Sequence, residues 1–256
     1  MNNSSLRDAQ KVMLDILVEF DRICQKYELT YWLDFGTALG AIRHQGFIPW
    51  DDDLDVSMLK EDYDKFLQVA PKELSSDFFL QTKKSDPCAV NFFAKIRHRG
   101  STFIDSWELK RDICYHQGIY IDIFPAMKVT KKTLDSFIFR ALILFSKLTH
   151  NRYIRIDFLT KIAIDIINSY SDSNGDYLIS SGETMHKLKP IEVDEFFPLQ
   201  KVAFEGKYFP VPKNAKKYLA IMFGDDFMQL PPEDKRKVHS VYIDINTPCK
   251  VEQKNE

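Results

Sequence analysis

The strongest constraint on the fold of this 256-residue chain is a cluster of four aspartates within five residues. Asp51, Asp52, Asp53 and Asp55 repel one another unless water or a cation balances their charge. The residues that follow, up to Met58, alternate in polarity like a β-strand, which places Asp53 and Asp55 on one side of it. Paired carboxylates offer hard oxygen ligands to a cation, whereas the alternative is a solvated acidic loop in front of a strand.

A glycine-threonine pair lies shortly before this cluster. Gly36 and Thr37 follow a strand expected at 30–35 and precede a short helix expected at 38–44. Free backbone N–H groups at the start of a helix bind phosphate, and glycine permits close approach of a ligand. We expect this turn to face the aspartate strand.

A third acidic position lies in an otherwise apolar segment. Asp122 interrupts a strand expected at 119–124, which Pro125 is expected to close. A carboxylate in a core strand is costly unless it is paired or bound to a metal ion. We therefore group Asp122 with Asp53 and Asp55.

Hydrophobic periodicity indicates an α+β fold with a helical insertion or second lobe. We expect a catalytic core at 1–125, a helical block at 126–190, and a C-terminal hairpin and helix at 191–256 that complete the site. The expected helices are 8–29, 60–70 (ended by Pro71), several within 130–170, and 213–222 (ended by Gly224); the further strands are 78–82, 91–97, 101–104 and a hairpin around Glu205 and Gly206.

The charge balance argues against a nucleic-acid partner. The chain has 35 Lys and Arg residues against 37 Asp and Glu residues, and a phosphate backbone demands a cationic excess. A small ligand is the better expectation.

The cysteines and the amino terminus predict a cytoplasmic protein. Cys24, Cys88, Cys114 and Cys249 show no CxxC spacing, so we expect them to be reduced. The first residues lack the apolar run of a signal peptide, and no segment reaches the roughly 20 apolar residues of a spanning helix.

Longer motifs carry a family resemblance. The sequence resembles the signature of the LicD family of phosphocholine transferases at 35–37 (FGT), 39–44 (LGAIRH), 46–55 (GFIPWDDDLD), 121–125 (IDIFP), 196–199 (FFPL), 209–212 (FPVP) and 223–228 (FGDDFM). The match spans most of the chain outside about 126–190.

The resemblance implies a nucleotidyltransferase-like fold, with a small mixed β-sheet flanked by helices, and a transferase activity. Family members are associated with moving phosphocholine from CDP-choline to a sugar hydroxyl of a cell-surface glycan precursor, such as lipopolysaccharide or teichoic acid; relatives move other alcohol phosphates. By position, Asp53, Asp55 and Asp122 would be catalytic and hold Mg²⁺ or Mn²⁺. Gly36 and Thr37 would bind phosphate, and Asp122 would either complete the metal site or accept the hydroxyl proton.

Two further parts of the signature have alternative readings. Arg43 could grip a phosphate or pair with Asp51 or Asp52 at the surface. Asp225 and Asp226 would border the site by family likeness, or simply form the turn that ends a helix.

Cationic and aromatic residues near the predicted site also have two interpretations. Lys95 and Arg97 alternate on one strand, so they line the anionic pocket or an exposed sheet face. Tyr31, Trp32 and Trp50 could form a wall for a quaternary ammonium group, or pack in the core.

The helical block and the activity itself leave alternatives. The basic and apolar segment 130–155 would lie on the inner face of an anionic membrane, near a lipid-linked oligosaccharide acceptor, or pack against its own domain. The competing functions are a nucleotidyltransferase that attaches a nucleoside monophosphate to a small-molecule hydroxyl, and a non-enzymatic binding module.

Overall fold

The computed structural model describes residues 3–109, 111–151, 154–155, 157–180 and 189–253. Its helices and strands follow one another as α1 (Asn3–Lys26), β1 (Tyr31–Leu33), α2 (Phe35–His44), β2 (Asp55–Leu59), α3 (Lys60–Glu73), β3 (Phe78–Gln81), β4 (Ala94–His98), β5 (Thr102–Asp105), β6 (Tyr120–Val129), α4 (Lys131–Asp135), α5 (Phe137–Thr149), β7 (His150–Asn151), β8 (Ile154–Arg155), α6 (Asp157–Asn168), β9 (Tyr177–Ser180), β10 (Ile191–Glu192), α7 (Val193–Phe196), β11 (Gln200–Phe204), β12 (Lys207–Val211), α8 (Ala215–Phe223), a 3₁₀ turn (Glu233–Lys235), β13 (Ser240–Asp244) and α9 (Lys250–Gln253).

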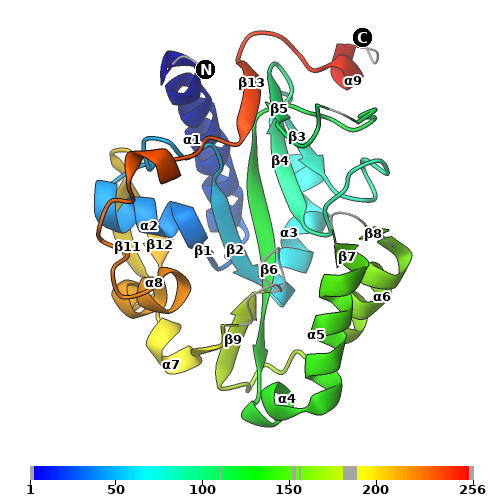
Figure 1. Ribbon diagram of the computed structural model, residues 1–256, viewed down its shortest axis with the longest axis vertical. Coiled ribbons are helices and arrows are strands. Elements are labelled where there is room, and N and C mark those ends of the chain that lie inside the picture. The colour runs from blue at the N-terminus through cyan, green and yellow to red at the C-terminus, as the bar shows by residue number, and fades with distance from the viewer. Residues whose placement is uncertain (1–2, 110, 152–153, 156, 181–188, 254–256) are drawn as a thin grey trace.

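The long strand β6 is the centre of the main sheet (Figure 1). The strand order is β1-β2-β6-β4-β3, and β9, followed by β10, pairs with the far half of β6. β2 and β6 are parallel, whereas β1, β4 and β9 pair antiparallel with their neighbours. The sheet is therefore mixed, as expected from the sequence.

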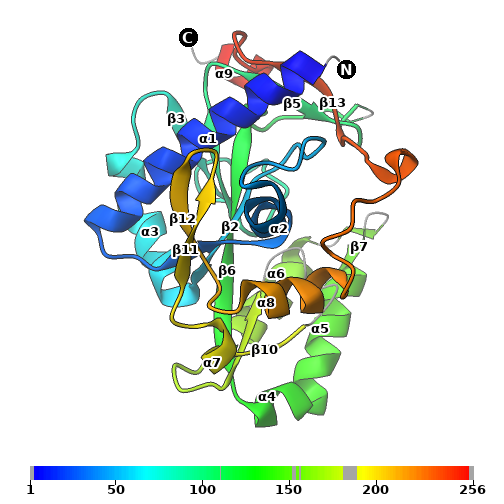
Figure 2. The same cartoon turned by 90° about the vertical axis from the view of Figure 1, so that its left-hand side faces the viewer.

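Helices α1 and α3 cover one face of this sheet, and α2 lies on the other (Figures 1 and 2). The covered face is apolar because the odd-numbered residues of β6, such as Ile121 and Ile123, point into the core with Val56 of β2. The apolar stripe of α1, which includes Met13 and Phe20, packs there with no exposed surface. The opposite face is left for the polar side chains of the site.

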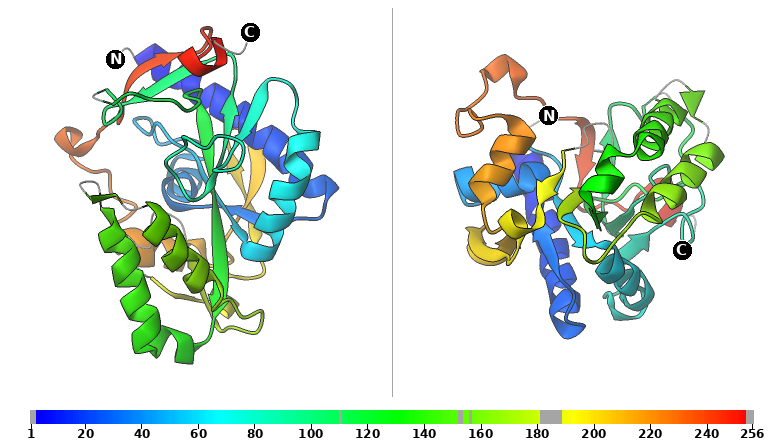
Figure 3. Two further views of the ribbon diagram at one scale, coloured as in Figure 1. Left: turned by 90° about the vertical axis from the view of Figure 1, so that its right-hand side faces the viewer. Right: turned by 90° about the horizontal axis from the view of Figure 1, so that it is seen from below.

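A second, smaller core lies beside the far half of β6. Met127 and Val129 of β6 pack there with Phe139 and Ile143 of α5 and Ile167 of α6. Viewed from below, α4, α5 and α6 lie on one side of the sheet, and α7, α8 and the β11-β12 hairpin lie on the other (Figure 3). The three helices lie within the range 130–170 where helices were expected, and the hairpin around Glu205 and Gly206 is formed by β11 and β12.

Pro125 does not end the central strand, which continues to Val129. The Asp122 N–H donates to the carbonyl of Leu54, the residue before β2. Backbone nitrogens alternate in direction along a strand, so the odd-numbered residues of β6, which include Pro125, direct theirs away from β2. On that side the pairing with β4 stops opposite Ile123 and the pairing with β9 starts opposite Ala126. Pro125 lies between these two paired segments, where no partner strand needs an N–H donor. Its missing N–H therefore costs no hydrogen bond between strands.

Two helix ends also differ from the sequence expectation. α3 passes Pro71 and ends at Glu73, because the Leu74 N–H still bonds to the Ala70 carbonyl and closes the last turn. α2 begins at Phe35 rather than at residue 38, because Asp34 caps it and the Ala38 N–H reaches the Asp34 carbonyl. Gly36 and Thr37 therefore lie in the first turn of α2.

In the part of the chain that the structure describes, no helix combines the length and apolar character needed to span a bilayer. The expected boundary at residue 125 falls inside β6. The division of the chain into three parts stays a prediction.

Candidate active site

The start of α2 is bonded to the start of β2, which brings the glycine-threonine turn to the aspartates. The Asp34 N–H donates to the Asp55 carbonyl over 3.0 Å, and the Asp55 N–H donates to the Thr37 hydroxyl over 2.8 Å. Thr37 is buried, and its hydroxyl is occupied by this bond. We find that Thr37 positions Asp55, a contact that the motif alone does not reveal.

Gly36 leaves room for a neighbouring carboxylate. A Cβ atom at this position would lie 3.0 Å from Oδ2 of Asp51. Asp51 therefore lies against the first turn of α2, where the positive end of the helix dipole favours a negative group. The turn thus already holds one anionic group of the protein itself.

Asp34 is a buried acid that the sequence analysis did not single out. Its carboxylate accepts hydrogen bonds from the Phe35 N–H, from Ser57 of β2 and from the Tyr218 hydroxyl of α8. Burial raises the pKa of Asp34, and these donors oppose that shift. Asp34 thereby ties α2, β2 and α8 together beneath the site.

Asp55 and Asp122 occupy opposite positions in the parallel register of β2 and β6. Their carboxyl groups therefore lie on the same face of the sheet, as the sequence predicted. On the other side of β6, Lys95 of β4 pairs with Asp122 in register, and its ammonium group forms a buried ion pair with the Asp122 carboxylate. The Lys95 ammonium also lies 3.6 Å from the centroid of the Tyr120 ring.

The carboxylates around Asp55 repel one another. Burial raises the pKa of Asp55 well above its ordinary value, and the charges of Asp53 and Asp122 raise it further. The pKa of Asp53 is raised by burial and by the charge of Asp52. The pKa of Asp51 is raised by burial and by Asp53, with which it shares a hydrogen bond. Positive charge near this cluster would relieve the repulsion.

A cleft of about 350 Å³ opens beside the aspartates. Asp53 and Asp122 line one end of it, together with the two strand cations Lys95 and Arg97. The other walls come from β5 and the loop after it, from β6 and from the C-terminal segment, with the side chains of Phe103, Asp105, Trp107, Glu108, Tyr115, Tyr120 and His239. The sequence analysis did not single out residues 105–108, although Asp105 and Glu108 lie close to Trp107 in the sequence.

Asp52 anchors the C-terminal segment to the cleft. Its carboxylate accepts the N–H of His239 over 2.8 Å and the N–H of Ser240 over 2.5 Å. Ser240 begins β13, which pairs with β5. His239, the residue before this strand, is thereby held where it lines the cleft.

Arg43 lies in the last turn of α2, and its role in binding phosphate stays a prediction. Its guanidinium donates to the backbone carbonyls of Phe227 over 2.8 Å and Gln229 over 3.1 Å, and so fastens the turn after α8 to the end of α2. Asp225 and Asp226 lie in that turn, and both are exposed. Neither is among the described residues that line the cleft.

The other candidates divide between cleft and core. Arg97 lines the cleft and donates to the Gln81 side chain over 2.6 Å and to the Gly118 carbonyl over 2.8 Å. Tyr31 and Trp32 are buried core residues. The Arg236 guanidinium lies 4.7 Å from the centroid of the Trp50 ring.

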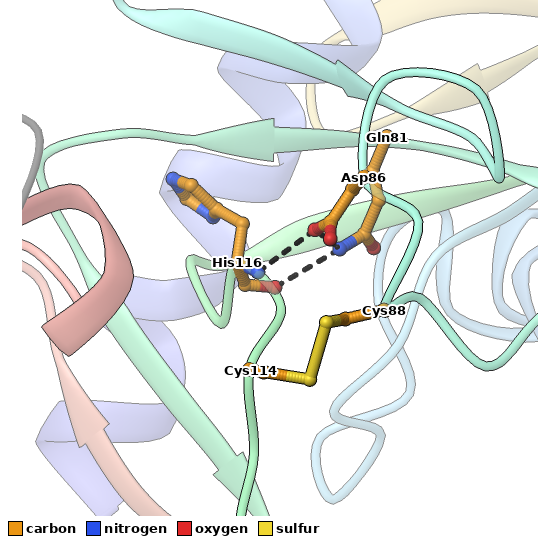
Figure 4. The surroundings of a disulfide bond; sticks show 5 residues. All are labelled: Gln81, Asp86, Cys88, Cys114 and His116. Atoms are coloured by element: carbon orange, nitrogen blue, oxygen red, sulfur yellow. Dashed lines mark hydrogen bonds between the residues drawn. A yellow bond between two sulfur atoms is a disulfide. The ribbon is translucent and has the colours of Figure 1, made fainter.

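Two of the cysteines form a disulfide, which corrects the expectation that all four are reduced. Cys88 and Cys114 lie in different loops, and their Cα atoms are 5.7 Å apart (Figure 4). Asp86 brings these loops together, because its carboxylate accepts the His116 N–H over 2.9 Å and the Gln81 amide over 2.8 Å. The pair is 26 residues apart in sequence, so a search for short cysteine spacings misses it. Cys24 and Cys249 are free and buried.

The donor set of this site fits a hard divalent cation. Asp55 and Asp122 lie on the same face of the sheet, and the charges of Asp53 and Asp122 raise the pKa of Asp55, so a cation would offset their mutual repulsion. Among the described residues, no three Asp, Glu, His or Cys side chains converge closely enough to hold an ion by themselves. A metal ion at this site stays a prediction.

Comparisons with known proteins agree with this geometry. Residues 28–141 match the family model described as LicD/FKTN/FKRP, nucleotidyltransferase domain. The lipopolysaccharide cholinephosphotransferase LicD of Haemophilus influenzae is 30% identical over 94% of this chain and 98% of its own. The human ribitol 5-phosphate transferase FKRP is 28% identical over 37% of this chain and 23% of its own. An uncharacterized protein of Rickettsia typhi is 40% identical over 23% of this chain and 19% of its own. The chain belongs to the LicD family.

Proposed function

We propose that this protein transfers an alcohol phosphate, phosphocholine first among them, from a CDP-alcohol to a sugar hydroxyl of a cell-surface glycan precursor. The observation that carries the proposal is the position of Asp55 opposite Asp122 across β2 and β6, with Asp53 and Asp122 lining the cleft, in a chain that aligns almost end to end with a lipopolysaccharide cholinephosphotransferase. The human relative is named for moving ribitol 5-phosphate, so the two relatives share an alcohol phosphate as cargo.

Asp53 and Asp55, with Asp122 beside them, would hold Mg²⁺ or Mn²⁺. Bound there, the ion would neutralise charge on the donor diphosphate and on the departing CMP. Lys95 fixes the direction of the Asp122 carboxyl group through their buried ion pair. Thr37 holds the backbone of Asp55 in place.

The reaction is an in-line displacement. The acceptor hydroxyl oxygen attacks the phosphorus that carries the alcohol, and the bond from this phosphorus to the bridging oxygen breaks. CMP leaves with that electron pair, and the hydroxyl proton passes to Asp122 or to water. Positioning and charge account for most of the catalysis in such transfers.

The wall of the cleft formed by residues 105–108 favours choline as the alcohol. Asp105, Glu108 and the Trp107 ring line this wall, and carboxylates with an aromatic face attract a quaternary ammonium group. Glu108 is held by the Tyr115 hydroxyl and by the Gln117 amide. An uncharged polyol would gain nothing from this negative wall.

Release of CMP from a panel of CDP-alcohols tests the proposal. The purified protein should release CMP fastest from CDP-choline, only with a glycan acceptor present, and excess EDTA should stop the reaction. If CDP-choline, CDP-ribitol and CDP-glycerol all remain intact with acceptor and Mg²⁺, the proposal is wrong.

A nucleotidyltransferase is the second candidate, because the matching family model carries that description. It would attach a nucleoside monophosphate to a small-molecule hydroxyl and release pyrophosphate. Incubation with each nucleoside triphosphate and Mg²⁺ distinguishes the two, because only the second candidate yields pyrophosphate.

A further inference from the structure

The helices α5 and α6 expose apolar side chains that no described part of the fold covers. Phe137 of α5 is 84% exposed, Leu148 of α5 is 60% exposed, and Phe158 of α6 is 73% exposed. Globular proteins rarely leave several large apolar side chains together at the surface without a binding role. Figures 1 and 3 show these helices on the outside of the molecule.

The exposed stripe of α5 is a second apolar face, separate from the one that packs in the core. Phe139 and Ile143 are buried in the second core, whereas Phe137, Leu144 and Leu148 lie about half a helical turn away and are exposed. α5 is therefore apolar on both sides. A helix that needed only to pack on its own domain would carry polar residues on its outer side.

The charge of the same region identifies the partner. From Lys131 to Asn168 the sequence contains seven Lys and Arg residues against three Asp residues, a net charge of +4 in a chain of −2. Lys131, Lys132 and Lys161 are exposed beside the apolar stripes. Apolar side chains flanked by cations are the pattern of helices that lie in the interface of an anionic bilayer.

A second copy of the chain fits this face poorly. A symmetric dimer places a surface patch against itself, so each cationic region would meet another of the same sign. An anionic lipid surface instead attracts the lysines and receives the apolar side chains.

We propose that α4, α5 and α6 dock the protein on a bilayer rich in anionic phospholipid, with Phe137, Leu144, Leu148 and Phe158 entering the headgroup region. The docking does not depend on the transferase activity, since its test needs neither donor nor acceptor.

Flotation of the full chain with lipid vesicles tests this proposal. The protein should float with vesicles of phosphatidylcholine that contain phosphatidylglycerol, and stay behind with phosphatidylcholine alone or at high ionic strength. The double variant Phe137→Ser/Leu144→Ser should reduce partitioning by about tenfold or more. Tyr208→Ser, which removes an equally exposed aromatic from β12, should change nothing.

A charge variant tests the electrostatic part and does not disturb the helix packing. Lys131→Gln/Lys132→Gln should lower partitioning about 30-fold at low salt. The matched pair Lys207→Gln/Lys216→Gln, exposed elsewhere, should leave it unchanged. Failure of the unmodified protein to float with phosphatidylglycerol vesicles overturns the proposal. So does a dimer in sedimentation equilibrium that Phe137→Ser/Leu144→Ser dissociates, because a second copy would then cover the face.

Discussion

Asp55 and Asp122 lie opposite each other across the parallel strands β2 and β6, with both carboxyl groups on the face of the sheet that carries the cleft. Burial and the neighbouring charges raise the pKa of Asp55 well above its ordinary value. Two carboxylates arranged in this way repel each other, and this repulsion does not stabilise the fold of the protein alone. Removal of one of the two charges should therefore affect activity and stability in opposite directions.

Asp55→Asn should lower CMP release by at least about 100-fold, because the proposed site would lose a carboxylate ligand of the cation that is expected to stabilise transition-state charge. The midpoint of thermal unfolding should stay the same or rise, since a repulsive buried charge disappears. Asp194→Asn, on an exposed turn of α7, is the matched control and should change neither quantity. Full activity in Asp55→Asn would contradict the assignment of the site.

Lys95→Met should destabilise the fold by about 3 kcal/mol, because Asp122 loses the cation that balances its buried charge. Urea unfolding measures this change. The double variant Lys95→Met/Asp122→Asn should recover part of the loss, since the carboxylate is then neutral. If the two substitutions instead add without coupling, the ion pair does not contribute as the structure indicates.

The ion pair between Arg7 and Glu205 predicts a pH-dependent part of the stability. The two side chains meet at 2.5 Å, and the Arg7 hydrogen bond lowers the pKa of Glu205 from 4.5. Glu205 therefore stabilises the fold above its unfolded pKa, and this stabilisation is lost as the pH falls through the lower folded pKa.

The comparison of Glu205→Gln with the unmodified protein checks this expectation. The difference in unfolding free energy should be largest near neutral pH and should shrink below pH 4.5, where the unmodified side chain also becomes neutral. A difference that is constant from neutral to acidic pH would show that charge is not involved.

Removal of the disulfide should cost about 3 kcal/mol of stability, as expected for a cross-link that closes a loop of this length. Cys88→Ser/Cys114→Ser should unfold at lower urea concentration than the oxidised protein, and dithiothreitol should have no further effect on it. Thiol titration of the unfolded, unreduced protein should find two free thiols. Four free thiols would show that the protein is reduced as prepared, as is common for cytosolic proteins.

Trp107→Leu should raise the KM for CDP-choline by about tenfold, because an aromatic face is lost where the ammonium group is expected. The KM for CDP-ribitol should change far less. This test depends on the proposed transferase activity, and the ratio of the two KM values separates a specific effect from general damage to the cleft. Equal changes for both donors would remove Trp107 from alcohol recognition.

Local sequence pattern was sufficient to predict the acidic half of the site. Asp53 and Asp55 alternate with core residues, and Asp122 is conspicuous in an apolar strand, so each could be placed on a strand face. Their meeting depends on β2 and β6 being parallel neighbours in register, which the structure establishes. Their catalytic and metal-binding roles stay predictions.

Contacts between distant segments could not be predicted in the same way. Lys95 was placed on the correct face of its strand, yet its pairing with Asp122 follows from the register of β4 on β6, which no short pattern encodes. Pro125 is a strand terminator in most contexts, and only the gap between β4 and β9 allows it inside β6. The sequence also does not reveal the paths of loops, and the contacts of Arg43, Cys88 and Cys114 are all with loop residues.

The hydrogen bonds that the backbone N–H groups of His239 and Ser240 donate to Asp52 have a consequence for biosynthesis. The central sheet can form once the chain has grown past β9, but the acidic cluster gains these backbone donors only after residue 240 has left the ribosome. A nascent chain would thus carry a folded central sheet before the carboxylate of Asp52 gains its backbone partners, so this end of the cleft would be completed after the sheet itself.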